Sequence, residues 1–311
     1  MRRRFALLLA VACLGAFRAV AQDLESLLPA LSDDRAGAVI AQLESDAAQG
    51  DLAAKVTLGR IYLNGIYYLQ NMKRGCDLFE EAARAGSAEA AARLALCFEE
   101  GAGREADVDQ ATAWYQASID GGYSLAKCLM GEAYIRGTLG PADPERGIQL
   151  CLEAALDGVP SAQLTIATHY LTGEHLPQDS GKAHIWITAA AQAGIPRAQY
   201  NLAIMYENGD GTERSLNEAS YWYQSAARQG YDAALLPLAR LYYRASIEEE
   251  TGDIKRQPAQ IAYFWLSVAQ YRAPTDRDRV LARQMLEVYR ENVDPARIAA
   301  WEKAIEEDLS R

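Results

Sequence analysis

Small, apolar and aromatic residues recur along this chain with a fixed period of 36 residues. Counted from the glycine that opens each period, an alanine stands at position 4, a large aliphatic residue or methionine at position 8 and an aromatic residue at position 12. The six opening glycines are Gly50, Gly86, Gly122, Gly158, Gly194 and Gly230. Because glycine makes up only about 7% of an average protein, six matched glycines indicate a repeated structural unit.

Each period is predicted to contain two helices. Positions 4, 8, 9 and 12 lie on one face of a first helix, and a glycine at position 15 in five of the six units suits its C-terminal cap. N-cap residues then recur as Asn71, Asp107, Asp143, Asp179 and Ser215. A second helix follows, with a small residue at position 25 and leucine or tryptophan at position 28. Each unit is therefore predicted to be a helix hairpin.

A hairpin of this length cannot bury its own apolar face, so successive hairpins must stack. We expect an all-α solenoid of six hairpins over residues 50–272, with an N-terminal capping helix in 22–49 and C-terminal capping helices in 273–311. The sixth unit departs from the pattern because its loop carries about seven additional residues, which include Glu248, Glu249 and Glu250.

The fifth unit carries the whole pattern, as Ala198, Leu202, Ala203, Tyr206, Gly209, Gly211, Ala219, Trp222, Tyr223, Ala226, Ala227 and Gly230. This pattern resembles the Sel-one-like repeat family, a relative of the tetratricopeptide repeat, over about residues 32–272. Departures are local: the second loop glycine occurs only at Gly103 and Gly211, and Leu78 and Leu150 replace an aromatic residue. The resemblance implies a right-handed α/α superhelix that acts as an adaptor or scaffold. It also implies similarity to exported bacterial regulators and assembly factors of the cell envelope.

Residues 1–21 have the features of a signal peptide. Three arginines precede a short apolar run, and Ala19-Val20-Ala21 offers a cleavage site before Gln22. The run is shorter than the roughly 20 residues of a spanning helix, which argues against an uncleaved anchor. Lipoprotein processing at Cys13 is a further alternative. We expect a periplasmic or secreted bacterial protein that is cleaved near Ala21 and is not inserted in the membrane afterwards.

The chain is acidic, with a formal net charge of −11. Removal of residues 1–21 takes away four arginines and no acidic residue, which changes the net charge to −15. Such a chain repels polyanions, and no basic run with interleaved aromatic residues remains, so we expect no nucleic-acid partner.

Four cysteines follow the signal segment: Cys76, Cys97, Cys128 and Cys151. In an oxidising compartment they allow three pairings. Cys128 and Cys151 are equidistant from the loop of the third hairpin, and Cys76 and Cys97 flank the Gly86 turn in the same way. We therefore favour the bridges Cys128–Cys151 and Cys76–Cys97 over four separate buried thiols.

The sequence lacks the recognised catalytic motifs: it has no G-x-S-x-G elbow, phosphate-binding glycine loop or H-E-x-x-H helix. We expect neither an enzyme nor a bound cofactor. The chain's three histidines, His169, His175 and His184, all lie in the fourth unit, where a hairpin could bring them together as a metal site. The alternative is that His169 packs in a helix and His175 is solvated. A metal-binding or metal-regulated protein is thus the second functional hypothesis.

The face of each first helix opposite the core consists of positions 3, 7, 10 and 14, whose residues vary from unit to unit. In a tetratricopeptide-like superhelix this face lines the concave groove. It includes Arg60, Asn64, Arg93, Arg136, Asn201, Asn208, Arg240 and Arg244. Unpaired cationic and amide groups there would suit the backbone or carboxylates of an extended peptide. We therefore expect an interaction scaffold or regulator that binds another envelope or secreted protein or peptide. A glycan-binding protein would need paired carboxylates and exposed aromatic residues in the groove, where few are found.

Overall fold

A computed structural model describes residues 33–65, 71–247 and 256–309 of the chain. The predicted signal peptide, the mature segment before residue 33 and the acidic insertion at Glu248 to Glu250 lie outside the described residues. The chain divides into two compact units, Met1–Asp157 and Gly158–Arg311, and each is described by itself.

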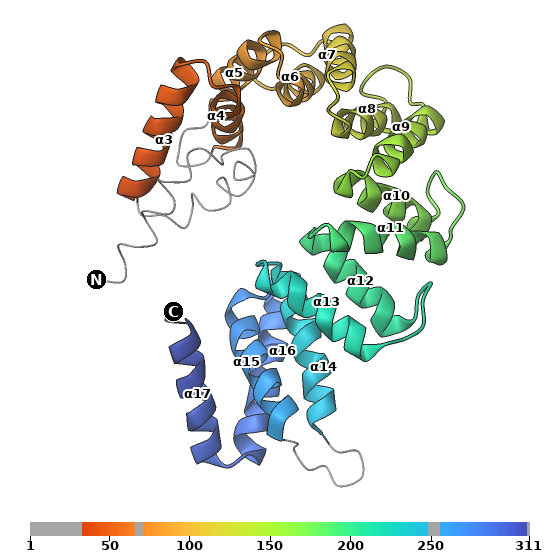
Figure 1. Cartoon of the computed structure of the whole chain (residues 1–311). Coiled ribbons are helices and arrows are strands. Elements are labelled where there is room, and N and C mark those ends of the chain that lie inside the picture. Colours follow the sequence, from red (N-terminus) through yellow and green to blue (C-terminus); the bar gives the residue numbers. More distant parts are fainter. Residues whose placement is uncertain (1–32, 66–70, 248–255, 310–311) are drawn as a thin grey trace. The chain divides into compact units, whose positions relative to one another are not determined.

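Unit 1 is helical throughout its described part, and consecutive helices pair into hairpins (Figure 1). Its helices are α3 (Asp33–Ala48), α4 (Leu52–Asn64), α5 (Met72–Arg84), α6 (Ala88–Glu100), α7 (Val108–Asp120), α8 (Leu125–Arg136) and α9 (Pro144–Leu156). The hairpins are α4/α5, α6/α7 and α8/α9. Helix α3 packs against α4 through Ala36, Ile40 and Leu43.

Unit 2 continues the same scheme. Its helices are α10 (Pro160–Thr172), α11 (Ser180–Gln192), α12 (Pro196–Asn208), α13 (Leu216–Arg228), α14 (Leu235–Ser246), α15 (Arg256–Arg272), α16 (Asp276–Asn292) and α17 (Pro295–Leu309), with a short 3₁₀ turn at Asp232–Ala234. The hairpins are α10/α11, α12/α13 and α14/α15. Helices α16 and α17 share one core with the last hairpins through Leu286, Tyr289 and Trp301. The described residues thus form six hairpins, and the predicted all-α solenoid is confirmed.

The hairpin turns follow the predicted capping chemistry. Gly65, Gly101, Gly137, Gly173 and Gly209 end the first helices with φ between 68° and 84°. All five predicted N-cap side chains of the second helices accept a hydrogen bond from the backbone N–H three residues later. Because these bonds satisfy helix ends locally, the sequence alone places the helix boundaries well.

The core differs from the prediction in its largest members. The position 4 alanines are buried, as expected, but among the position 12 aromatic residues only Tyr134 is buried, at 8% exposed, and the others are partly exposed. Within the repeats, fully buried rings instead lie on the second helices, as Phe79, Tyr115 and Tyr223, each at most 1% exposed. They occupy position 29, one residue after the leucine or tryptophan that the sequence pattern singled out.

No helix in the described ranges combines the length and the apolar character that crossing a membrane requires.

Candidate protein-binding surface

The candidate binding surface comprises positions 3, 7, 10 and 14 of the first helices, and we call it the first-helix surface. It is the side of each first helix that lies away from the buried alanines of position 4. In unit 1 it lies on α4, α6 and α8, and in unit 2 on α10, α12 and α14. The two parts differ in whether their arginine side chains are already engaged.

In unit 1 the arginines of this surface are paired within the fold. Arg93 on α6 forms an ion pair with Glu89 one turn earlier, at 3.4 Å. Arg136, the last residue of α8, binds Glu99 at 2.7 Å and also lies 3.7 Å from Glu132. The expectation of unpaired arginines is therefore wrong for these two. Arg60 is half-buried and Asn64 is exposed on α4.

Arg136 is held in place by its ion pair with the buried carboxylate of Glu99. The Glu99 side chain, on α6, is only 1% exposed, and its carboxylate accepts a hydrogen bond from the Tyr115 hydroxyl at 2.6 Å and from Thr138. Arg136 supplies the compensating charge, since a buried carboxylate is stable only when paired and hydrogen-bonded. Burial and the Glu99 carboxylate both raise the pKa of Tyr115, which keeps its hydroxyl protonated as a donor. Arg136 thus joins the second and third hairpins.

In unit 2 the first-helix surface contains an open hollow of about 470 Å³ between α10, α12 and the loop that follows α10. Leu171, Ile204 and Met205 give it an apolar part, and Arg197 and Asn201 project from α12. Neither Arg197 nor Asn201 makes a hydrogen bond or ion pair with the residues that the structure describes. The side chains of Arg197 and Asn201 are therefore available to a ligand, whereas Thr168, Thr172 and Gln178 of the same hollow donate hydrogen bonds to backbone carbonyl groups.

Of the unit 2 residues predicted from the sequence, Asn201 alone lines the hollow. Asn208 donates a hydrogen bond to Asp210 at 3.1 Å, and Arg240 and Arg244 lie exposed on α14. Sequence reasoning missed Arg197, Thr168 and Thr172, although they occupy positions 3, 10 and 14 of the same register. The register of positions 3, 7, 10 and 14 was a sufficient signal for all three residues.

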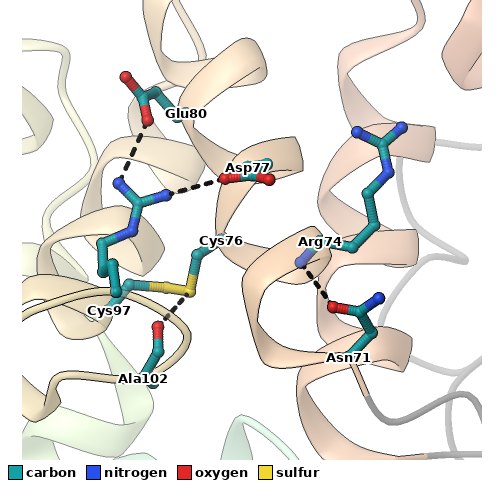
Figure 2. Close-up of a disulfide and its surroundings, with 8 residues drawn as sticks. Asn71, Arg74, Cys76, Asp77, Glu80, Cys97 and Ala102 are labelled. Carbon is teal, nitrogen blue, oxygen red and sulfur yellow. Dashed lines mark hydrogen bonds and ion pairs between the residues drawn. A yellow bond between two sulfur atoms is a disulfide. The ribbon is translucent and has the colours of Figure 1, made fainter.

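Both predicted disulfides are present. Cys76 on α5 is joined to Cys97 on α6, and Figure 2 shows this bridge between two successive hairpins. The Cys76 Sγ lies 3.0 Å from the carbonyl oxygen of Ala102, a sulfur–oxygen contact rather than a hydrogen bond because an oxidised sulfur has no proton. Cys128 and Cys151 join α8 to α9 within the third hairpin.

The loop after α6 is fastened to α5 beside the first bridge. The guanidinium of Arg104 lies 3.2 Å from Glu80 and 3.6 Å from Asp77, and it stacks on Phe98 at 4.6 Å from the ring centre. A Cβ at Gly103 would lie 2.4 Å from the Met72 backbone, so only glycine fits there. The bridge, the glycine and the arginine together hold two hairpins of unit 1 in register.

The three histidines do not assemble. His169 and His175 lie close, with ring centres 5.4 Å apart, and His169 Nδ1 is 3.1 Å from the Glu174 carbonyl oxygen. His184 instead packs edge-on against Tyr206 of the next hairpin, where burial lowers its pKa. Over the described ranges, no three His, Cys, Asp or Glu side chains group closely enough to hold a metal ion. The hairpin geometry therefore does not support the metal hypothesis.

Comparison with known proteins supports the repeat assignment. The Sel1 repeat matches five consecutive segments, residues 52–87, 88–123, 124–159, 160–195 and 196–231. No curated protein sequence matches the chain significantly.

Solved structures resemble this chain to different degrees, and the first of the three named here shares its fold. A Sel1 repeat protein from Oxalobacter formigenes is 26% identical with a TM-score of 0.56, covering 72% of this chain and 89% of that one. A putative sel1 repeat protein from Klebsiella pneumoniae is 22% identical with a TM-score of 0.44, covering 65% and 98%. The immunity protein Pa5087 from Pseudomonas aeruginosa is 19% identical with a TM-score of 0.47, covering 76% and 81%.

The five matched segments cover more than half of the chain, and they coincide with the period, the caps and the hairpins described above. The chain belongs to the Sel1 repeat family.

Proposed function

We propose that this protein is an exported scaffold or regulator that binds an extended segment of a partner protein on the first-helix surface of unit 2. Sel1 repeat proteins generally mediate protein–protein interactions. The observation that carries the proposal is the hollow between α10 and α12, where Arg197 and Asn201 stand unengaged above apolar side chains.

The chemistry of the hollow suits a peptide. An asparagine amide can both donate to and accept from a peptide backbone, and an arginine can pair with a carboxylate in a bidentate way. Leu171, Ile204 and Met205 offer apolar contact for alternate side chains of an extended segment. In unit 1 the corresponding arginines are engaged by Glu89 and Glu99, which favours unit 2 as the binding part.

Export is supported by the two disulfides, because such bridges persist in oxidising compartments such as the bacterial periplasm. The N-terminal pattern of residues 1–21 supports the same destination. Cell fractionation with N-terminal sequencing tests this step. We expect mature protein to begin at or near Gln22 in the periplasmic or secreted fraction, and retention of Met1 in the cytosol contradicts export.

The binding proposal is tested by site-specific photocrosslinking in native cells. A photoreactive side chain at Thr172, on the rim of the hollow, is compared with one at Gln192, an exposed position on α11. We expect one partner to be crosslinked from Thr172 and not from Gln192. The double change Arg197→Ala and Asn201→Ala should abolish that crosslink.

Unfolding in denaturant provides the control for this variant. Because both side chains lack partners within the described fold, the variant should lose little stability, about 0.5 kcal/mol per position. Arg136→Ala is the matched comparison, since it should destabilise unit 1 by leaving Glu99 without its cation. A crosslink that survives the double change, or that forms equally from Gln192, contradicts the proposal.

A further inference from the structure

Three carboxylates in the described chain accept a hydrogen bond from the hydroxyl of a buried tyrosine. At distances between 2.6 and 2.9 Å, they are Glu99 with Tyr115, Glu207 with Tyr223 and Glu302 with Tyr263. Glu99 also pairs with Arg136 at 2.7 Å, and Glu302 with Arg290 at 3.5 Å. Glu207 makes no ion pair with any residue that the structure describes.

Glu99 and Glu207 occupy the same place in the repeat, because both stand at position 13 and both bond a tyrosine at position 29. The cation on Glu99 comes from position 14 of the following hairpin, which is Arg136. Position 14 after Glu207 is Arg244, which is exposed and makes no hydrogen bond or ion pair within the described ranges. The same carboxylate therefore has a cation in unit 1 and lacks one in unit 2.

The end of α14 differs from the end of α8 in a way that accounts for this. Arg136 is the last residue of α8, and Gly137 then turns the chain in the left-handed conformation with φ of 75°. Ala245 replaces that glycine in the sixth hairpin, and α14 continues to Ser246. The Ser246 hydroxyl lies 2.7 Å from the Tyr289 hydroxyl of α16. The end of α14 is thus bound to α16 and does not deliver a cation to Glu207.

Tyrosine rings lie beside the Glu207 carboxylate. Its anchor, Tyr223, has its ring 5.7 Å from the Tyr200 ring, which in turn lies 5.3 Å from the Tyr231 ring. Glu207, Tyr200 and Tyr231 are partly exposed, and Arg214 donates to the Glu207 backbone carbonyl rather than to its carboxylate. A carboxylate binds a guanidinium through charge-assisted hydrogen bonds, and aromatic faces attract the same cation.

We propose that the Glu207 carboxylate, flanked by Tyr200 and Tyr231, receives an arginine side chain of the partner segment. Its guanidinium takes on Glu207 the place that Arg136 takes on Glu99. Arg240 of α14 lies near Tyr223 but forms no ion pair with the described residues, so this place is not already taken. The inference rests on the proposed function and adds to it the charge of the partner.

The spacing along α12 gives the partner a pattern. Glu207 follows Arg197 by ten residues, which is about 15 Å along the helix axis. An extended segment rises about 3.3 Å per residue, so the residue that pairs with Arg197 and the arginine that pairs with Glu207 are about four or five residues apart. The acidic chain steers such a cationic segment toward itself, and added salt should weaken the association.

The test uses the chain without residues 1–21 and a synthetic peptide, acetyl-Ala-Arg-Ala-amide. Tyrosine ring NMR signals, assigned through Tyr200→Phe and Tyr231→Phe, report on the site. We expect the peptide to shift both signals with a dissociation constant in the millimolar range, since it makes few contacts. The same peptide with citrulline, which has the shape of arginine without its charge, should bind at least tenfold more weakly.

Glu207→Gln should weaken binding of the arginine peptide at least tenfold. Its thermal unfolding should change little, because the amide oxygen still accepts the hydrogen bond from Tyr223. Glu213→Gln is the matched control, since it removes the same charge from an exposed loop position of the same unit. That variant should bind the peptide as the wild-type protein does.

The proposal is overturned if the arginine peptide shifts neither tyrosine signal, if citrulline binds equally well, or if Glu207→Gln leaves the affinity intact. The double change Arg197→Ala and Asn201→Ala separates this site from the hollow of α10 and α12. It should leave binding of the arginine peptide unchanged, because these two side chains line that hollow. Failure of the photocrosslink thus counts against the hollow, and failure of the NMR titration counts against Glu207.

Discussion

Gly131 on α8 and Gly147 on α9 face each other so closely that a Cβ built on either would lie 2.4 Å from the carbonyl oxygen of the other. These residues occupy positions 9 and 25 of the third unit. In the first unit the same positions are Gly59 and Gly75, and a Cβ at Gly75 would lie 2.7 Å from the Gly59 oxygen. The second, fourth and fifth units carry alanine at both positions. The third hairpin is therefore packed at backbone contact.

Gly147→Ala should destabilise the protein by about 1–3 kcal/mol, because the added methyl group must push two helix backbones apart. Gly37→Ala, in α3, is the control. That glycine is also helical, but nothing lies within 4 Å of its Cβ position. It should be neutral or stabilising by up to about 1 kcal/mol, since alanine favours the helix. Urea unfolding measures both, and an equal effect of the two changes contradicts this packing.

Stability in alkali should depend on Tyr115. Burial and its hydrogen bond to Glu99 raise the pKa of this hydroxyl in the folded state, so the fold stabilises the neutral form. That contribution is present below about pH 10, the ordinary tyrosine pKa, and is lost as the pH rises above it. Tyr115→Phe should cost about 1.5–3 kcal/mol at neutral pH, the value of a hydrogen bond to a charged group.

The difference between the wild-type protein and Tyr115→Phe should then shrink above about pH 10. Unfolding free energies measured across that range check this. Tyr221→Phe, whose side chain is 58% exposed, should behave as the wild-type protein at each pH. A constant difference between Tyr115→Phe and the wild-type protein would mean that the Tyr115 hydroxyl is not the titrating group.

Reduction of the disulfides should destabilise unit 1. The bridges close loops of 21 and 23 residues, for which chain entropy gives about 3 kcal/mol each. Urea midpoints with and without reductant measure the loss. In the double variant Cys76→Ser and Cys97→Ser, only the Cys128–Cys151 bridge remains. Reductant should then lower the free energy of unfolding only by the contribution of that one bridge. Four free thiols in protein isolated from the envelope would contradict both bridges.

Acid should weaken the contact between the hairpins of His184 and Tyr206. Burial lowers the pKa of His184 below its ordinary value of about 6.5, and its Nε2 has no hydrogen-bond partner among the described residues. The neutral ring is thus favoured, and its contribution is lost as the pH falls below about 6.5. In His184→Leu the free energy of unfolding should depend less on pH below about pH 6.5 than in the wild-type protein. His175→Asn, at an exposed loop position, should leave that dependence unchanged. Identical profiles for His184→Leu and the wild-type protein exclude this role.

Much of the fold could be read from the sequence because it depends on local rules repeated six times. Helix ends follow from capping residues that act within one helical turn. The Asp143 side chain accepts a hydrogen bond at the start of α9, and Gly137 adopts the left-handed conformation at the end of α8. The pairing of Cys128 with Cys151 follows from their equal distance from one loop. Membership of the repeat family follows from the period itself, since a period is visible without any structure.

The sequence did not determine how side chains of successive hairpins meet. Arg136 and Arg197 both stand on the first-helix surface, yet Arg136 is engaged by Glu99 of the preceding hairpin and Arg197 is not engaged within the described chain. His184 lies near His169 in the sequence but packs on Tyr206 of the next hairpin. These contacts depend on the separation and rotation of neighbouring helices, which arise from the packing of all their side chains together. The tertiary structure therefore decided which polar groups hold the fold and which remain available to bind.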